Sequence, residues 1–135
     1  MSLLFYTVSI KLRLRHRKVF AMEIIKKTNA VKINNSKVCE VSECSFKNKS
    51  MDLGIATLTG RYPEKGYCVN TASEELVYVL EGSGKIFFED RDIEFSEGDS
   101  VLIDSGEKYF WDTKYCKAAL VCTPAWNSEQ YRLSE

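Results

Sequence analysis

Histidine is nearly absent from this sequence of 135 residues. The only one is His16, so residues 22–135 contain none. Imidazole is a preferred ligand of transition metals and the usual general base near neutral pH. Its absence from residues 22–135 excludes histidine-based metal binding and histidine-based acid–base catalysis there.

Long apolar runs and disulfide patterns are missing as well. No stretch of about 18 apolar residues could span a bilayer, so we expect no membrane association. The first 21 residues do not resemble a secretory leader, because their positive charges follow the apolar run. The five cysteines form no Cys-x-x-Cys pair, so we expect buried, reduced thiols in a cytoplasmic protein. These cysteines are Cys39, Cys44, Cys68, Cys116 and Cys122.

The formal net charge of zero conceals an uneven distribution. Residues 1–21 contain five basic side chains and no acidic one, so residues 22–135 carry 14 basic against 19 acidic side chains. An acidic body lacks the broad basic face that nucleic-acid binding requires. We therefore expect no nucleic-acid partner.

Residues 1–21 form a basic arm with two interpretations. In the first, Met22 is the natural start of the protein, because it begins the segment MEIIKKTNAVKI. In the second, the arm is an added strand, because polar and apolar residues alternate from Tyr6 to Arg15. Such a strand could pair with a sheet edge, including that of a second subunit. Both interpretations leave a single domain over residues 22–135.

Short apolar segments separated by turn residues recur over residues 30–122. The GSG sequence at 82–84 and the EDRD sequence at 89–92 are typical of antiparallel hairpin connections. Only residues 127–133 favour a short helical turn, which Asn127 or Ser128 would cap. The predicted fold class is therefore all-β. The predicted strands are 30–34, 38–46, 52–60, 75–81, 84–89, 92–95, 100–103, 108–112 and 116–122.

Two short motifs with a defined spacing lie in the central part of the chain. Glu75 and Gly82 are separated by six residues, and the segment GDSVLIDSGEKYFWDT contains Gly98 and Gly106. On these residues, the segment from about 52 to 126 resembles a small single-domain cupin. The resemblance implies a cupin-type antiparallel β-barrel, or jelly roll.

Metal-binding members of this family have histidines where this chain has other residues. Asp104, Tyr109 and Thr113 stand where the second motif has Pro, His and Asn. The resemblance implies that two further histidines, one residue apart, would precede Glu75 and complete a site for a divalent transition metal. Two loop lengths leave two pairs at those positions, either Val69 and Thr71 or Cys68 and Asn70. Neither pair replaces two imidazoles, so we expect no metal and no other cofactor.

Strand parity indicates which side chains line the barrel. If Glu75 faces inward, Val77 and Val79 do too, and an inward Tyr109 brings Trp111 and Thr113 with it. An aromatic pocket with few polar groups is typical of a small-molecule site. The candidate ligand-binding residues are Tyr62, Cys68, Asn70, Glu75, Tyr109 and Trp111.

The opposite face of the strand at 75–81 is also apolar, with Leu76, Tyr78 and Leu80. A strand that is apolar on both faces is covered on both. A second subunit would supply that cover, and homodimers are frequent in the family that the chain resembles. We therefore expect a homodimer.

The sequence leaves two main functions open. The first is metal-independent binding of a carbohydrate or another small polar metabolite. The second is a cupin enzyme of isomerase or related type, with Glu75 and Tyr109 as catalytic residues and a non-standard metal site that includes Cys68. A buried carboxyl has the raised pKa that acid–base catalysis requires, but a Glu bonded to Tyr or Cys is equally a structural pair. A third interpretation is a closed barrel with a structural role.

Overall fold

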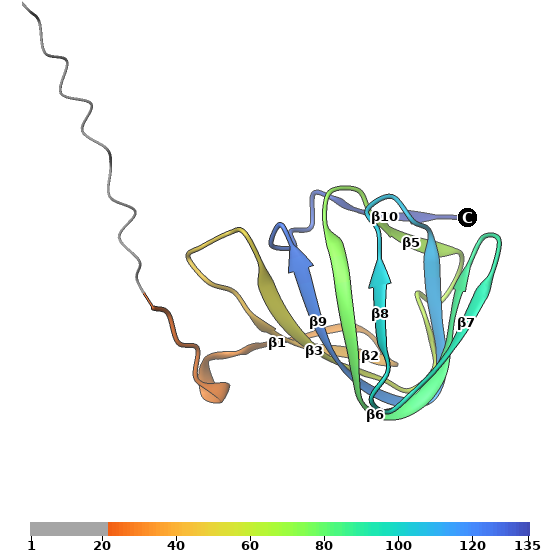
Figure 1. The fold of residues 1–135 in the computed structure, drawn as a ribbon, viewed down its shortest axis with the longest axis horizontal. Helices are drawn as coiled ribbons and strands as arrows, with labels where there is room; N and C mark the ends of the chain where they lie inside the picture. The colour runs from red at the N-terminus through yellow and green to blue at the C-terminus, as the bar shows by residue number, and fades with distance from the viewer. Residues whose placement is uncertain (1–21) are drawn as a thin grey trace, which may run out of the picture.

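Ten strands of one sheet and a single 3-10 turn make up the regular structure of residues 22–135, the part of the chain that the computed structural model describes (Figure 1). The predicted all-β fold class is confirmed. In chain order the elements are η1 (Lys27–Asn29), β1 (Val31–Ser36), β2 (Cys39–Cys44), β3 (Asp52–Leu58), β4 (Arg61–Tyr62), β5 (Tyr67–Asn70), β6 (Glu74–Phe88), β7 (Asp92–Ser96), β8 (Ser100–Ile103), β9 (Tyr109–Thr123) and β10 (Tyr131–Ser134).

The two longest strands, β6 and β9, form the spine of the fold. They pair antiparallel from Glu74 opposite Thr123 to Phe88 opposite Tyr109. The register shifts twice within residues 79–85 of β6. Bulges of this kind bend and twist a strand, and the ribbon in Figure 1 curves sharply at this point. The sheet therefore folds over on itself.

Each half of this spine pairs with its own neighbouring strands. The first half of β6 pairs with β8, and the second half of β9 pairs with β3, which is followed by β2 and β1. The second half of β6 pairs with β7, and the first half of β9 pairs with β4 and β5, which is followed by β10. Two layers of sheet thus face each other.

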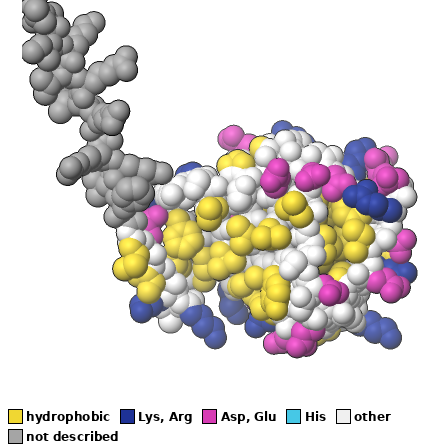
Figure 2. Space-filling view, in the orientation of Figure 1, with side chains coloured by type: hydrophobic (Ala, Val, Ile, Leu, Met, Phe, Trp, Pro, Cys, Tyr) yellow, Lys and Arg dark blue, Asp and Glu magenta, His cyan; other side chains and the backbone are white. Residues whose placement is uncertain are grey.

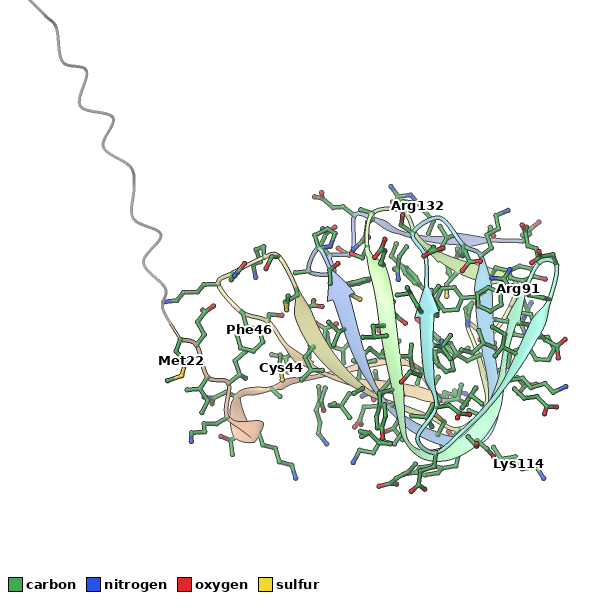
Figure 3. All side chains as sticks on the ribbon, viewed as in Figure 1. Met22, Cys44, Phe46, Arg91, Lys114 and Arg132 are labelled. Atoms are coloured by element: carbon green, nitrogen blue, oxygen red, sulfur yellow. The ribbon has the colours of Figure 1, made fainter. Side chains whose placement is uncertain are left out.

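Apolar side chains fill the space between these layers. Figure 3 shows side chains directed between the strands, whereas Lys114 and Arg132 lie at the periphery of the molecule. The core contains residues from both layers, including the fully buried Leu58 and Ile86. Burial of this apolar surface is the main force that holds the two layers together.

The predicted parity of both long strands is confirmed. Glu75, Val77 and Val79 are buried on β6, and the residues between them are exposed. In the first part of β9 the buried residues are Tyr109, Trp111 and Thr113. The period of two therefore directs Glu75 and the β9 aromatic residues to the same interior.

The GSG sequence at 82–84 is not a hairpin connection, contrary to the prediction. It lies inside β6, which continues through the expected gap between strands 75–81 and 84–89. Gly82 has a φ of 84°, and a Cβ there would lie 2.1 Å from the carbonyl oxygen of Tyr115. Glycine at 82 thus allows β6 to bend closely against β9. The predicted strands 108–112 and 116–122 are likewise one strand, β9.

The EDRD hairpin is confirmed, because the Phe88 amide donates to the Arg91 carbonyl oxygen at 2.7 Å and β7 returns alongside β6. The helical turn predicted for 127–133 is wrong. Asn127 Oδ1 does accept the amides of Glu129 and Gln130, at 3.0 and 3.3 Å. The chain then extends as β10, which pairs with β5 instead of coiling.

Residues 1–21 lie outside the described part of the chain, together with His16 and the arm's alternative edge strand. Immediately after them, the Glu23 carboxylate accepts the amides of Lys47 and Asn48 at 2.9 and 3.2 Å. This contact ties the start of the described chain to the loop before β3. Within residues 22–135, no helix has both the length and the apolar character needed to cross a membrane.

Candidate functional site

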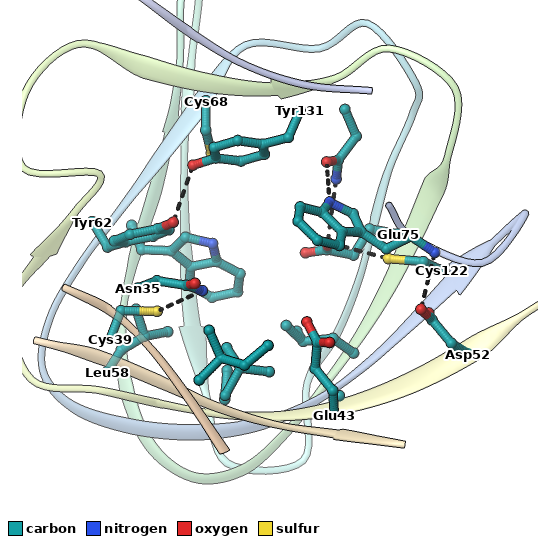
Figure 4. Close-up of a pocket in the computed structure, with 18 of the residues that line it drawn as sticks. Asn35, Cys39, Glu43, Asp52, Leu58, Tyr62, Cys68, Glu75, Cys122 and Tyr131 are labelled. Carbon is teal, nitrogen blue, oxygen red and sulfur yellow. Dashed lines mark hydrogen bonds between the residues drawn. The ribbon is translucent and has the colours of Figure 1, made fainter. Parts of the chain in front are cut away.

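A cavity of about 220 Å³ lies between the two layers of the folded sheet (Figure 4). Its walls come from β1, β2 and β3, from β4, β5 and β10, and from the long strands β6 and β9. Drug-sized ligands occupy pockets of roughly 300 Å³ or more, so this cavity suits a smaller metabolite. Five aromatic side chains line it: Tyr62, Tyr109, Trp111, Trp126 and Tyr131.

All six residues that the sequence analysis selected line this one cavity: Tyr62, Cys68, Asn70, Glu75, Tyr109 and Trp111. On β5, Cys68 and Asn70 are buried, whereas the alternative pair, Val69 and Thr71, is not. Of the two alternative pairs, Cys68 and Asn70 line the cavity. The role of these residues in binding stays a prediction.

Glu75 is the most enclosed carboxyl of the cavity, with 6% of its surface exposed. Both of its hydrogen bonds are long and end on Oε2, at 3.4 Å from Asn70 Nδ2 and 3.6 Å from Cys122 Sγ. Burial raises its pKa, and the Cys122, Asn70 and Tyr109 side chains oppose that effect. The carboxyl is thus held inside the barrel without a positively charged partner.

Asn70 connects Glu75 to the aromatic wall. Its Oδ1 accepts the indole Nε1–H of Trp126 at 3.1 Å, which leaves Nδ2 to donate to Glu75. Both ends of the Asn70 amide are therefore assigned by their partners. A change at Asn70 would release the carboxyl and the indole together.

The segment after β9 closes one side of the cavity, and Gln130 anchors it. Gln130 Oε1 accepts the amides of Ala72 and Ser73 at 3.1 and 2.6 Å, and its Nε2 donates to Ser73 Oγ at 2.6 Å. The Thr71 hydroxyl donates to the Gln130 carbonyl oxygen at 2.8 Å. These bonds position Trp126 and Tyr131 beside the cavity on both sides of the anchor.

Tyr131 also contacts the opposite wall. Its hydroxyl lies 3.1 Å from the Tyr62 hydroxyl, and its ring meets the Trp126 ring edge to face at 6.0 Å. Burial raises the pKa of Tyr62 to about 12, so both hydroxyls stay protonated at neutral pH. They can donate and accept hydrogen bonds within the cavity.

Sequence reasoning missed two further carboxylates of the cavity, Glu43 and Asp52. Burial raises the pKa of both, and the neighbouring Asp52 raises that of Glu43 further. Asp52 accepts the Trp126 amide at 2.9 Å, which opposes its own shift. A signal for Glu43 was present, because it shares the parity of Cys39 and Val41 on a predicted strand.

The residues of the cavity do not fit the transition-metal site that the cupin resemblance implies. No cluster of three or more His, Cys, Asp or Glu side chains within residues 22–135 is placed to hold a metal ion. Burial raises the pKa of Cys68 to about 12 and that of Cys122 as well. Both are therefore thiols at neutral pH, whereas metals bind the thiolate.

No family model matches the sequence, and no curated protein matches it. Among solved structures, the fold is similar to that of Streptomyces Pac13, a nucleoside dehydratase, with a TM-score of 0.73 and 12% identity over 85% of this chain and 92% of Pac13. Ectoine synthase from P. lautus gives a TM-score of 0.66 and 15% identity, over 84% of this chain and 91% of the synthase. The EutQ protein of Clostridium difficile gives 0.57 and 22%, over 72% and 73%.

These similar structures are cupin-fold proteins, and residues 22–135 have the same cupin β-barrel fold. The group includes enzymes as well as the EutQ protein. At these identities the likeness establishes the fold and leaves the activity open.

Proposed function

We propose that this chain is a metal-independent binding protein for a small polar molecule, either a carbohydrate or another metabolite, which occupies the cavity beside Glu75. The observation that carries the proposal is a cavity of about 220 Å³ with aromatic walls and a buried carboxyl held by Asn70. Rings bury the apolar faces of a small ligand, and the few polar groups orient it.

The fold likeness supports this proposal by analogy. Pac13 was determined with uridine, a small polar molecule, and its barrel has the same fold as this chain. The donor set of the cavity supports metal independence, because its thiols are protonated and histidine is missing from residues 22–135. An isomerase that uses Glu75 and Tyr109 stays the alternative prediction.

Intrinsic fluorescence offers a direct test, because both tryptophans of the chain, Trp111 and Trp126, line the cavity. Native mass spectrometry of the full chain as purified should show no transition metal, and should identify any bound small molecule. Titration of a binding compound should change the tryptophan emission. Glu75→Gln should weaken binding about tenfold, as expected for loss of a charge-assisted hydrogen bond.

Glu40→Gln is the matched control for this experiment. Glu40 lies on β2 with the parity opposite to that of Cys39 and Val41, and it forms an ion pair with Lys32 at 3.6 Å. Its replacement should leave affinity unchanged. A stoichiometric transition metal in the purified protein would contradict metal independence, and equal affinity in Glu75→Gln would remove the role given to that carboxyl.

We also propose that two copies of the chain associate through the outer face of β6 and β8. Leu76 and Tyr78 are each 48% exposed on β6, and Leu102 on β8, directly opposite Leu76, is 58% exposed. Figure 2 shows apolar side chains gathered on the side where these strands lie in Figure 1. Soluble monomers rarely expose large contiguous apolar patches, which supports a second copy as the cover.

A further inference from the structure

The cavity carries acidic groups without any basic one. Glu43, Asp52 and Glu75 line it, and its other lining residues include no Lys or Arg. None of these three carboxylates takes part in an ion pair within residues 22–135. The ion pairs of that region lie instead on exposed side chains such as those of Lys85 and Arg91. The interior of the barrel therefore offers three acidic groups and no described basic side chain to pair with them.

Glu75 is the acidic group of the cavity whose surroundings indicate a missing binding partner. Its side chain is more than nine-tenths buried and faces the cavity (Figure 4). The donors on its Oε2, Asn70 Nδ2 and Cys122 Sγ, are both at long distances, and the Tyr109 side chain acts on the carboxyl as a further hydrogen-bonding group. A buried carboxylate is costly unless a charge or good hydrogen bonds compensate it. Glu75 has no positively charged partner among the described residues, so a ligand in the cavity can supply the compensating charge.

The aromatic wall is suited to a cation as well. The rings of Trp111, Trp126 and Tyr131 line the same cavity as the three carboxylates. Aromatic faces attract ammonium groups through their quadrupole, and Trp is the strongest of them. Anionic ligands would meet three acidic groups and no basic side chain. The chemistry of the walls thus discriminates by ligand charge.

We infer that the ligand of this cavity is an organic cation, an amine or quaternary ammonium compound of metabolite size, whose charged group lies against Glu75 and between the aromatic rings. This inference rests on the proposed function, that the cavity binds a small polar molecule, and names the chemical class of that molecule.

The titration of Glu75 gives the binding of a cation a pH dependence. The other titratable groups of the cavity are Cys39, Tyr62, Cys68, Tyr109, Cys122 and Tyr131, all neutral at neutral pH, together with the carboxyls Glu43 and Asp52. Lys49 is the basic residue that acts on Asp52, whose pKa it lowers. A bound cation favours the ionised carboxylate, so binding releases protons and affinity rises with pH through the titration of Glu75.

Matched pairs of compounds test the inference on the full chain by tryptophan fluorescence. Choline is compared with its neutral carbon isostere neopentylcarbinol and with the anion of tert-butylacetic acid, and glucosamine is compared with glucose. We expect each cation to bind at least about tenfold more tightly than its neutral counterpart, with the anion weakest. Glu75→Gln should reduce that ratio to about threefold or less, whereas Glu40→Gln should preserve it.

The outcomes separate this inference from the proposed function. Equal or tighter binding of a neutral or anionic compound would overturn the cation inference and leave small-molecule binding intact. Failure of every compound to bind at millimolar concentration would overturn both. If Glu75→Gln is poorly folded by circular dichroism, Glu43→Gln takes its place, because Glu43 lines the cavity but is only partly buried. An unchanged charge preference in a folded Glu43→Gln would also count against the inference.

Discussion

Protonation of Glu75 should couple the stability of the barrel to pH. The carboxyl is 6% exposed, and burial raises its pKa above the ordinary value of 4.5. A group whose pKa is raised in the folded state holds its proton more tightly there than in the unfolded chain. Its contribution to stability is complete below the unfolded pKa and is lost as the pH rises through the folded pKa. Glu75→Gln cannot ionise and should escape this loss.

Thermal unfolding of both proteins across a pH series measures this effect. The melting temperature of Glu75→Gln should rise relative to that of the wild type as the pH increases from about 4 to neutrality. Glu40→Gln, on the outer side of β2, should show no such trend. A constant difference between Glu75→Gln and the wild type would mean that the pKa of Glu75 is not raised in the folded state.

Strand parity explains why part of the cavity was predictable from the sequence. An inward Glu75 or Tyr109 assigns every second residue of its strand to the interior, and the structure follows that assignment. Asp52 and Trp126 were not predicted, because they reach the cavity only through the folding of distant segments. The amide of Trp126 bonds to Asp52 at 2.9 Å across 74 residues of sequence. Local patterns hold no information on such a contact.

At the scale of elements, the sequence patterns predicted most strands but divided the long strands β6 and β9 into two strands each. Glycine permits both the φ of a tight turn and the φ of a bulge. The GSG sequence at 82–84 is therefore compatible with a hairpin and with a bent strand, and only the pairing of β6 with β9 decides between them. The two-residue strand β4 and the four-residue strands β5 and β10 are too short for a clear alternation.

Gly82 should be the least replaceable glycine of the sheet. Gly82→Ala would force a side chain into a φ of 84° and place its Cβ 2.1 Å from the Tyr115 carbonyl oxygen. Because the obstruction is backbone, β6 and β9 would have to separate at the bend. We expect a loss of about 3 kcal/mol or more in the free energy of unfolding, measured by urea denaturation.

Gly98→Ala is the control for this prediction. Gly98 has a similar φ of 88°, but no atom lies within 4 Å of a Cβ placed there. Its replacement should cost only the conformational strain, about 1 kcal/mol. Equal losses in the free energy of unfolding of Gly82→Ala and Gly98→Ala would contradict the prediction. They would show that the positive φ determines the cost in both variants, and that the close approach of β6 and β9 at Gly82 adds nothing to it.

At the scale of the whole molecule, the folded sheet has two apolar faces with different roles. The inner face encloses the core and the cavity. The outer face of β6 and β8 has no cover from residues 22–135, although Leu76, Tyr78 and Leu102 lie close together on it. Covering this face with a second copy would leave the cavity unobstructed, because the two faces are on opposite sides of the same strands.

This arrangement predicts a dimer that a single charge on the outer face disrupts. The wild type should sediment at twice the chain mass of 15.5 kDa at micromolar concentration. Leu102→Asp would bury an unpaired carboxylate in the interface, and should raise the dissociation constant of the dimer at least about hundredfold. Leu133→Asp is the matched control, because Leu133 is 65% exposed on β10, away from this face.

Sedimentation and ligand binding together connect this prediction to the cavity. Leu102→Asp should be monomeric yet bind small molecules with wild-type affinity, because Leu102 faces outward and does not line the cavity. A monomeric wild type would contradict the interface outright. A dimer that survives in Leu102→Asp but dissociates in Leu133→Asp would place the interface at β10 instead, on the edge of the sheet beside the segment that Gln130 anchors.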